Sequence, residues 1–327
     1  MLRRLLNHAE IELQIKAVDP LLIASGVPNA YGTDMPFVLT YRNGSDRGEP
    51  YLPGSSLKGV LRSHVERISR SIAPNAGVCD PHFTDADTSA RTRFCGKRLD
   101  QKTSKTGDSQ NNDRKELPTY ERYKKSCPIC RTFGSTVYKG RLSIGDAYLE
   151  NSSEFNSFTI EHRDGVGIDR FTGGASRGAK FEMEVLTDGT FCTRLRIENF
   201  ENWQLGLVAI ICRDLSDDLI SIGHSTTRGL GRIHGELKKF DIFYVVRPNK
   251  QLDSKKVYGV GALMEEDNER KRYGYAKEDT ISLGKENSAK RDGVIRLKQS
   301  FIDSMAQNAL FDSAVDCWAT RMENWGG

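Results

Sequence analysis

Residues 53–62 read Pro53-Gly54-Ser55-Ser56-Leu57-Lys58-Gly59-Val60-Leu61-Arg62, a turn of small residues followed at once by apolar residues at helical spacing. The apolar series that continues from this stretch is Leu57, Val60, Leu61, Val65, Ile68 and Ile72. This spacing predicts an amphipathic helix with one buried face, and Ser56 is its expected N-cap.

The start of this helix is a candidate phosphate site. Unpaired N–H groups and the positive end of the helix dipole favour an anion at a helix N-terminus. Lys58 and Arg62 lie one turn apart and are expected on the exposed face of the helix. Ser55, Ser56 and Gly59 supply further candidate contacts. The alternative interpretation is a capped surface helix with solvated cations.

The composition is that of a soluble globular protein. The chain has 327 residues, 37% of them hydrophobic, and a formal net charge of +4, so it is long enough for one large core or two ordinary ones. The apolar run at residues 1–6 is too short for a signal peptide, and we expect a cytoplasmic protein with no membrane segment. Because the net charge is small, any nucleic-acid affinity must come from local clusters of Lys and Arg.

The order of predicted elements indicates an α+β fold. An alternating strand at residues 11–17 precedes the helix, and a second strand is expected at residues 141–149. Residues 181–197 are expected to form a hairpin with its turn at Asp188-Gly189. A buried helix at residues 203–215, capped by Asn202, and a last strand at residues 233–246 complete the order. The sum is β-α-β-β-α-β, the ferredoxin-like (RRM-like) arrangement, whose sheet can present a face to RNA.

Two segments lie outside this minimal domain, which spans residues 1–246. Residues 73–135 are a largely polar insertion. Residues 247–327 form a C-terminal extension that is expected to be partly helical, because residues 301–325 have helical apolar spacing. We expect a neighbouring subunit to cover that helix.

Four cysteines of the insertion, Cys79, Cys95, Cys127 and Cys130, have a spacing that suits a metal. A Cys-x2-Cys knuckle with two more cysteines in a segment poor in apolar residues is typical of a tetrahedral structural zinc site. Metal binding would offset the ordering entropy of so polar a segment. His82 is an alternative ligand to one of the cysteines, and isolated reduced thiols are the alternative to a metal.

Three further segments follow the helix in sequence. They are Cys127-Pro128-Ile129-Cys130-Arg131-Thr132-Phe133-Gly134-Ser135, Gly165-Val166-Gly167-Ile168-Asp169-Arg170-Phe171-Thr172-Gly173-Gly174-Ala175, and Gly223-His224-Ser225-Thr226-Thr227-Arg228-Gly229-Leu230-Gly231-Arg232. Together with residues 53–62, and in this order, they resemble the RAMP superfamily of CRISPR-associated proteins. The closest resemblance is to the repeating backbone subunit of type III interference complexes, and it spans residues 9–245.

The resemblance implies an activity. In this family, an Asp in a loop before the Pro-Gly-Ser-Ser motif is required for metal-dependent cleavage of the target RNA, and Asp34 occupies that place. The RNA supplies its 2′-OH as nucleophile, so the protein needs to hold the backbone in line and to place a carboxylate or a divalent cation, such as Mg²⁺, near the reacting oxygens. A solvated turn residue is the alternative role of Asp34.

The resemblance also implies RNA contacts. Residues 163–179 are similar to the family's thumb, a hairpin that wedges into the duplex of guide and target. Its glycines permit close backbone approach. The candidate RNA-binding residues there are Arg163, Arg170, Thr172 and Arg177, and elsewhere Arg131, Ser135, Thr227, Arg228 and Gly229. A flexible hairpin with solvated arginines is the alternative.

Three functions follow as hypotheses. The first is a guide-RNA-binding backbone subunit of a type III CRISPR antiviral complex that cuts complementary target RNA through Asp34, with guide RNA, target RNA and other RAMP-type subunits as partners. The second is an inactive structural RNA-binding subunit. The third is a guide-processing endoribonuclease, because a histidine can act as a general base on a 2′-OH and His224 lies in the last glycine-rich loop.

Overall fold

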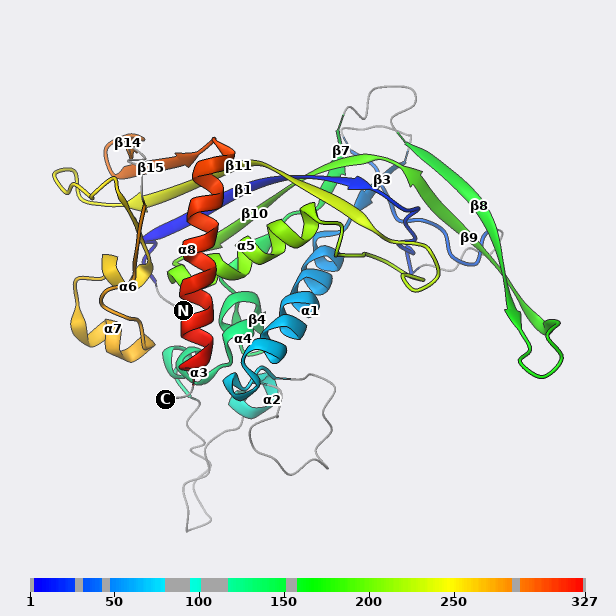
Figure 1. The fold of residues 1–327 in the computed structure, drawn as a ribbon, viewed down its shortest axis with the longest axis horizontal. Helices are drawn as coiled ribbons and strands as arrows, with labels where there is room; N and C mark the ends of the chain where they lie inside the picture. The colour runs from blue at the N-terminus through cyan, green and yellow to red at the C-terminus, as the bar shows by residue number, and fades with distance from the viewer. Residues whose placement is uncertain are drawn as a thin grey trace, which may run out of the picture.

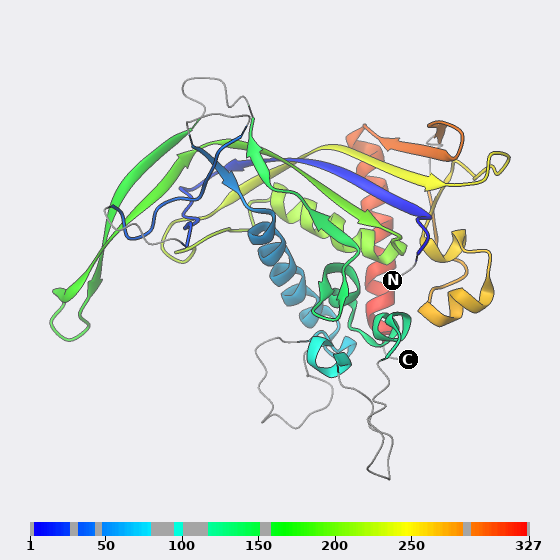
Figure 2. The same ribbon diagram turned by 180° about the vertical axis from the view of Figure 1, so that it is seen from behind.

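The computed structural model describes residues 3–26, 32–42, 48–79, 95–100, 117–150, 158–283 and 289–325. One antiparallel sheet forms one layer of the molecule, helices cover one of its faces, and a two-stranded ribbon projects far beyond the ends of its central strands (Figures 1 and 2). His82, the alternative metal ligand, lies outside the described residues. No helix in the described part of the chain is long and apolar enough to cross a membrane.

The sheet has nine strands in an order that sets non-consecutive strands side by side. The order is β14 (Lys290–Arg291), β15 (Arg296–Phe301), β11 (Ile233–Val245), β1 (Asn7–Ala17), β10 (Thr190–Glu198), β7 (Ala147–Leu149), β3 (Glu49–Leu52) and β2 (Leu39–Thr40), and β6 (Leu142–Ile144) also pairs with β10. All of these pairings are antiparallel.

Strand β1 lies at the centre of the sheet, between β10 and β11. Its alternating sequence buries Ile11, Leu13 and Ile15 on the helix-covered face and leaves the intervening polar residues on the open face. The predicted strands at residues 11–17 and 233–246 are confirmed.

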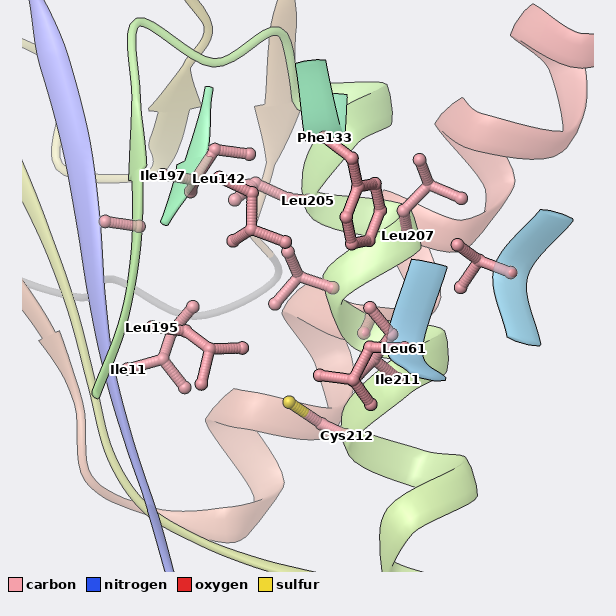
Figure 3. Close-up of a cluster of buried hydrophobic side chains, with 14 of the residues drawn as sticks. Ile11, Leu61, Phe133, Leu142, Leu195, Ile197, Leu205, Leu207, Ile211 and Cys212 are labelled. Carbon is pink, nitrogen blue, oxygen red and sulfur yellow. The ribbon is translucent and has the colours of Figure 1, made fainter. Parts of the chain in front are cut away.

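Helices α1 (Gly54–Ile72) and α5 (Asn202–Ser216) pack against the apolar face of the sheet. Figure 3 shows Leu61 of α1 and Ile211 of α5 directed toward Ile11 and Leu195 of the central strands. The predicted buried helix is therefore confirmed, but its cap is not the expected one. Glu201 caps α5, and it forms a reciprocal pair of hydrogen bonds with Gln204.

Helix α8 (Ser304–Glu323) packs on α5 of the same chain. Trp318 and Leu310 are buried in that contact. A Cβ atom added at Gly206 of α5 would lie 2.3 Å from the Ala314 carbonyl oxygen of α8, so the two helices approach closely. The expectation that a neighbouring subunit covers this helix is wrong for the face that meets α5.

The start of α1 differs from the sequence prediction. The helix begins at Gly54 and not at Leu57, and Ser56 makes no capping bond. Instead, the Gly54 N–H donates to Asp146 Oδ1 at 2.7 Å. Asp146 lies where the predicted strand at residues 141–149 breaks into β6 and β7. A distant carboxylate thus takes the place of the local cap.

Strands β8 (Thr159–Ile168) and β9 (Ala175–Asp188) form the projecting ribbon. The predicted hairpin at residues 181–197 is wrong, because β9 pairs with β8 and β10 pairs with β1. At Gly189 the chain has no positive φ and runs on from β9 into β10. The ribbon is therefore a direct extension of a central strand.

The remaining elements belong to the insertion, to the few residues directly after it, and to the extension. They are η1 (Pro74–Ala76), α2 (Cys95–Asp100), α3 (Thr119–Lys125), α4 (Pro128–Phe133), β4 (Gly134–Ser135), β5 (Tyr138–Lys139), β12 (Lys256–Tyr258), α6 (Val260–Leu263), α7 (Asp267–Tyr273) and β13 (Thr280–Ser282). A second apolar cluster with four tyrosines, among them Tyr123 and Tyr273, joins α3 to α7. The extension and the insertion thus share one core.

Two glycines of α1 give a matched test of this packing. A Cβ atom at Gly54 would lie 2.7 Å from the Ile144 carbonyl oxygen, whereas one at Gly59 would meet nothing within 4 Å. Helix propensity favours Ala at both sites by roughly 0.5–1 kcal/mol. We expect Gly59→Ala to raise the free energy of unfolding by about that amount, and Gly54→Ala to lower it by about 1–3 kcal/mol. Chemical denaturation measures both, and a stabilised Gly54→Ala variant would contradict the contact.

Candidate nucleic-acid interface and metal centre

The four cysteines of the insertion converge. Their Sγ atoms all lie within 4.8 Å of one another, and all four side chains are buried. The Cys79–Cys130 and Cys127–Cys79 Sγ distances are 3.4 Å and 3.7 Å. Four sulfurs at about 2.3 Å from one tetrahedral zinc ion would lie about 3.8 Å apart. The cluster therefore has the size of a Cys₄ zinc site and could hold such an ion.

Two arginines contact the sulfurs. Arg62 Nη2 donates to Cys130 Sγ at 3.3 Å, and Arg98 Nη2 lies 3.7 Å from Cys95 Sγ. Four thiolates around a divalent cation carry two net negative charges, which two guanidinium groups balance. Backbone N–H groups of Cys127 and Cys130 also donate to sulfurs of the cluster. The donors around the cysteines therefore suit thiolates.

The thiols perturb one another's protonation. A hydrogen bond from Cys127 lowers the pKa of the Cys95 thiol, and one from Cys130 lowers the pKa of Cys127. The hydrogen bonds of Cys130 to its neighbours raise its own pKa. The lowered pKa values of Cys95 and Cys127 shift these two thiols toward the thiolate, the form that binds a metal ion.

Arg62 does not lie on an exposed face as the sequence predicted. Besides Cys130, it donates to Glu66 at 2.9 Å and to the Gly134 carbonyl oxygen at 3.1 Å. The buried side of α1 is rotated from the predicted one, since Glu66 and Ser69 are buried while Ile72 is 54% exposed. The insertion folds against this side of α1 and covers it. The side chain of Arg62 is therefore held by the cysteine cluster, Glu66 and β4.

Lys58 keeps a different environment. Burial lowers the pKa of its ammonium group, and the neighbouring cations Arg62 and Lys139 lower it further. Among the described residues, neither Lys58 nor Lys139 has a carboxylate within ion-pair distance. Lys139, on β5, was not identified from the sequence, because only the short β4–β5 pairing brings it to α1. Ser135 lies on β4 of the same hairpin and is half-buried.

The very start of α1 is less favourable to an anion than the sequence suggested. The carboxylate of Asp146 already accepts the Gly54 N–H and neutralises the positive end of the helix. Ser55 and Gly59 are exposed and Ser56 is half-buried. The unpaired positive charge lies one turn further on, at Lys58 and Lys139.

Asp34 lies in a loop that is bonded to the root of the ribbon. The Glu182 N–H of β9 donates to Asp34 Oδ2 at 2.9 Å. The next residue, Met35, exchanges backbone hydrogen bonds of 3.0 Å and 3.1 Å with Glu182 and Glu184. The Asp34 side chain is exposed, and no described group donates to its Oδ1. The loop therefore holds this carboxylate in a defined place with one oxygen open to solvent.

Two ribbon residues beside this loop were not identified as site residues from the sequence. Glu184 accepts the Phe37 N–H at 2.9 Å and the Thr33 hydroxyl at 3.5 Å. His162, opposite Glu184 on β8, has its Nδ1 3.4 Å from the Thr33 hydroxyl. Only the pairing of β8 with β9 brings these two residues to a loop that lies far away in sequence.

The tip of the ribbon is a turn organised by one carboxylate. Asp169 Oδ1 accepts the N–H groups of Phe171 and Thr172 and the Thr172 hydroxyl, at 2.9, 2.7 and 3.0 Å. These hydrogen bonds, those from Thr172 first, lower the pKa of Asp169. Thr172, a candidate RNA contact, thus serves the turn. The residue presented to solvent is Phe171, which is 98% exposed.

The ribbon arginines are spread along its length. Arg163 on β8 binds Glu161 at 3.0 Å, whereas Arg170 and Arg177 near the tip are exposed without a described carboxylate partner. Only the latter two present an unpaired charge.

The last glycine-rich loop meets the root of the ribbon indirectly. The His224 N–H donates to the Leu22 carbonyl oxygen at 2.8 Å, and Leu21 pairs with Leu186 of β9. Thr227, Arg228, Gly229 and His224 are all exposed. The structure thus brings the Asp34 loop, the ribbon root and this loop to one end of the sheet. Arg131, by contrast, lies buried in α4, away from them.

The metal centre gives a direct test. Purified protein is expected to carry about one zinc ion per chain, and Cys127→Ser should remove it and lower the unfolding free energy by several kcal/mol. Cys192→Ser, at an exposed cysteine on β10 outside the cluster, is the matched control and should change neither quantity. Elemental analysis measures the zinc content, and thermal melting measures the change in stability. A metal-free protein of unchanged stability would contradict the assignment.

Comparisons with known proteins agree with this arrangement. A family model described as the RAMP superfamily matches residues 14–234, about two-thirds of the chain. No curated protein matches the chain. The matched region contains the Asp34 loop, helix α1, the four cysteines, the ribbon and the last glycine-rich loop up to its end. The chain therefore belongs to the RAMP superfamily of CRISPR-associated proteins.

Proposed function

We propose that this chain is a guide-RNA-binding backbone subunit of a type III CRISPR complex, and that it cleaves complementary target RNA at Asp34. The observation that carries the proposal is the docking of the Asp34 loop on β9, which places an exposed carboxylate at the root of a ribbon with an exposed phenylalanine at its tip. The partners are guide RNA, target RNA and further RAMP-type subunits.

The same proposal assigns the core to the ferredoxin-like arrangement. Its support is the strand order β11-β1-β10-β6, with α1 and α5 on one face of the sheet. The open face of these strands is not a simple basic surface, because ion pairs such as Arg194–Glu12 and Lys298–Asp241 cover it. We therefore place the RNA along α1 and the ribbon and not across the sheet.

Cleavage would proceed by attack of a 2′-OH on the adjacent phosphorus. The new bond joins the 2′ oxygen to phosphorus, the bond to the 5′ oxygen breaks, and the 2′ proton passes to a base while the 5′ oxygen gains one. A ribbon that wedges between bases favours this reaction by splaying the backbone into line, and Phe171 has the exposure and shape for a wedge. Asp34 would act through a divalent cation held beside the reacting phosphate group, and His162 beside Thr33 is a candidate proton acceptor.

A divalent cation such as Mg²⁺ would stabilise the charge that develops on the phosphate oxygens. Asp34 would be its protein ligand. Among the described residues, the cysteine cluster is the one group of three or more metal-ligating side chains within reach of one ion. RNA oxygens and water molecules would supply the other ligands beside Asp34.

Asp34 can be tested with a substitution that keeps its hydrogen bond. Asp34→Asn retains an oxygen for the Glu182 N–H and removes the charge, so assembly and RNA affinity should persist while target cleavage falls by about 10²-fold or more. Asp292→Asn, in an exposed turn between β14 and β15, is the control and should cleave normally. The measurement is cleavage of labelled target RNA by the assembled complex with Mg²⁺ present.

The alternatives make different forecasts in that assay. Cleavage of target by the Asp34→Asn complex at the normal rate would reject Asp34. No cleavage by the unaltered complex would support the inactive scaffold. Cleavage of a labelled guide precursor, lost in His224→Ala, would support the processing nuclease.

A second test concerns the cations on α1. Lys58→Gln with Lys139→Gln should weaken the binding of unrelated RNA sequences equally and lower the salt slope by roughly one for each lost phosphate contact. Arg62 is left intact, because it bonds to the cysteine cluster. Arg67→Gln, on the exposed side of the same helix, is the control. Unchanged affinity and salt slope in the double variant would move the phosphate contacts elsewhere, most simply to Thr227-Arg228-Gly229.

A further inference from the structure

A cavity of about 890 Å³ opens between the insertion and the end of α8, on the helix side of the molecule away from the ribbon root. Five cations line it, and its described lining contains no Asp or Glu. They are Arg98, Lys124, Lys125, Arg131 and Arg321. Lys125 pairs with Glu121 at 3.3 Å, and none of the other four has a carboxylate partner in the described part of the chain. Arg98 contacts Cys95 Sγ of the cysteine cluster, so the cations of the described lining without a nearby negative group are Lys124, Arg131 and Arg321.

The most deeply buried of these cations is Arg131, which is only 5% exposed. Its Nη2 donates to the Lys124 carbonyl oxygen, but its Nε and Nη1 atoms are buried without a hydrogen-bond partner. Burial of a guanidinium group without a counter-charge is costly. The buried carboxylate nearby, Glu201, accepts hydrogen bonds from Tyr123 and Trp203 and lies beyond ion-pair distance of Arg131. The charge on Arg131 is thus unmatched within the described protein.

An aromatic side chain holds the cations in place. The guanidinium of Arg131 lies 4.3 Å from the ring centroid of Trp325, and that of Arg321 lies 4.8 Å from it. Trp325 is itself packed against Trp203 at 5.3 Å. Two arginines fixed on one indole are preorganised for an anion with several oxygens.

We propose that this cavity binds the phosphate groups of a nucleotide, as a free nucleotide or as the phosphorylated end of an RNA. A single small anion would leave most of the cavity empty, while a nucleotide fits its volume. Several fixed cations suit a di- or triphosphate better than one carboxylate. This site is separate from Asp34 and from Lys58, so the proposal does not depend on target cleavage.

Calorimetric titration of the purified, zinc-loaded full-length chain tests the site. The probes are ATP, inorganic phosphate, a short RNA with a 5′-phosphate, the same RNA with a 5′-hydroxyl, and a polyglutamate peptide. We expect ATP or the 5′-phosphorylated RNA to bind, and Lys124→Gln with Arg321→Gln to weaken that binding roughly tenfold or more. Lys255→Gln, at an exposed lysine of the extension outside the cavity, should bind like the unaltered chain.

The probes distinguish a free nucleotide from the phosphorylated end of an RNA. Affinity for ATP alone indicates a nucleotide site, and preference for 5′-phosphate over 5′-hydroxyl RNA, kept in the Lys58→Gln, Lys139→Gln background, indicates an RNA end. Arg131→Met tests the buried charge directly, and unchanged zinc content shows that this variant is folded. The proposal is overturned if neither ATP nor the 5′-phosphorylated RNA binds, if inorganic phosphate or polyglutamate binds as tightly as these two probes, or if the double variant binds as tightly as the unaltered chain.

Discussion

The hydrogen bond from the Gly54 N–H to Asp146 fixes the position of helix α1, on which the rest of this structure depends. It locks the start of α1 onto the break between β6 and β7, so closely that a side chain at residue 54 would collide with the strand backbone. From that anchor, Leu57, Leu61 and Val65 reach under the sheet. The other side of the helix is then directed at the insertion.

The insertion depends on α1 for its charge balance. It contributes few apolar side chains, and four buried sulfurs take the place of a larger core. Arg62 joins the two parts, since it reaches from the helix to Cys130 and to the Gly134 carbonyl oxygen. The β4–β5 hairpin that follows the cysteines then brings Lys139 beside Lys58. The candidate metal centre and the candidate phosphate contacts on α1 are therefore connected through the same helix and the β4–β5 hairpin.

The ribbon of β8 and β9 places the Asp34 loop and Phe171 outside the main sheet. Strand β9 continues into β10, so the ribbon is rooted in the centre of the sheet and not in a surface loop. The Asp34 loop bonds to β9 at Glu182 and Glu184, close to where the ribbon leaves the sheet. The exposed carboxylate of Asp34 therefore lies at the root of the ribbon, and the exposed Phe171 lies at its tip.

The sequence by itself determined what depends on local pattern and on spacing. Alternation predicted β1, and β11 was expected as the last strand. Apolar content predicted the buried helix α5, and the spacing of four cysteines predicted that they converge. It could not decide which side of α1 would be covered or what would cap it. Helical periodicity predicts an apolar stripe, but it says nothing of partners that are distant in sequence. Asp146, which accepts the Gly54 N–H, lies 92 residues from Gly54. Cys130 and Gly134, which accept hydrogen bonds from Arg62, lie 68 and 72 residues from Arg62.

Only the tertiary structure decided which polar groups meet. The pairing of β8 with β9 placed His162 and Glu184 beside Thr33. The chain continues from β9 into β10 without a turn at Asp188-Gly189, because β10 pairs with β1. Packing of the end of α8 buried Arg131 against Trp325, although the family resemblance implied an RNA contact for this residue. The sequence thus specified the residue types and the order of elements, and long-range packing assigned each charge its environment, because the energy of a charge depends on what surrounds it in space.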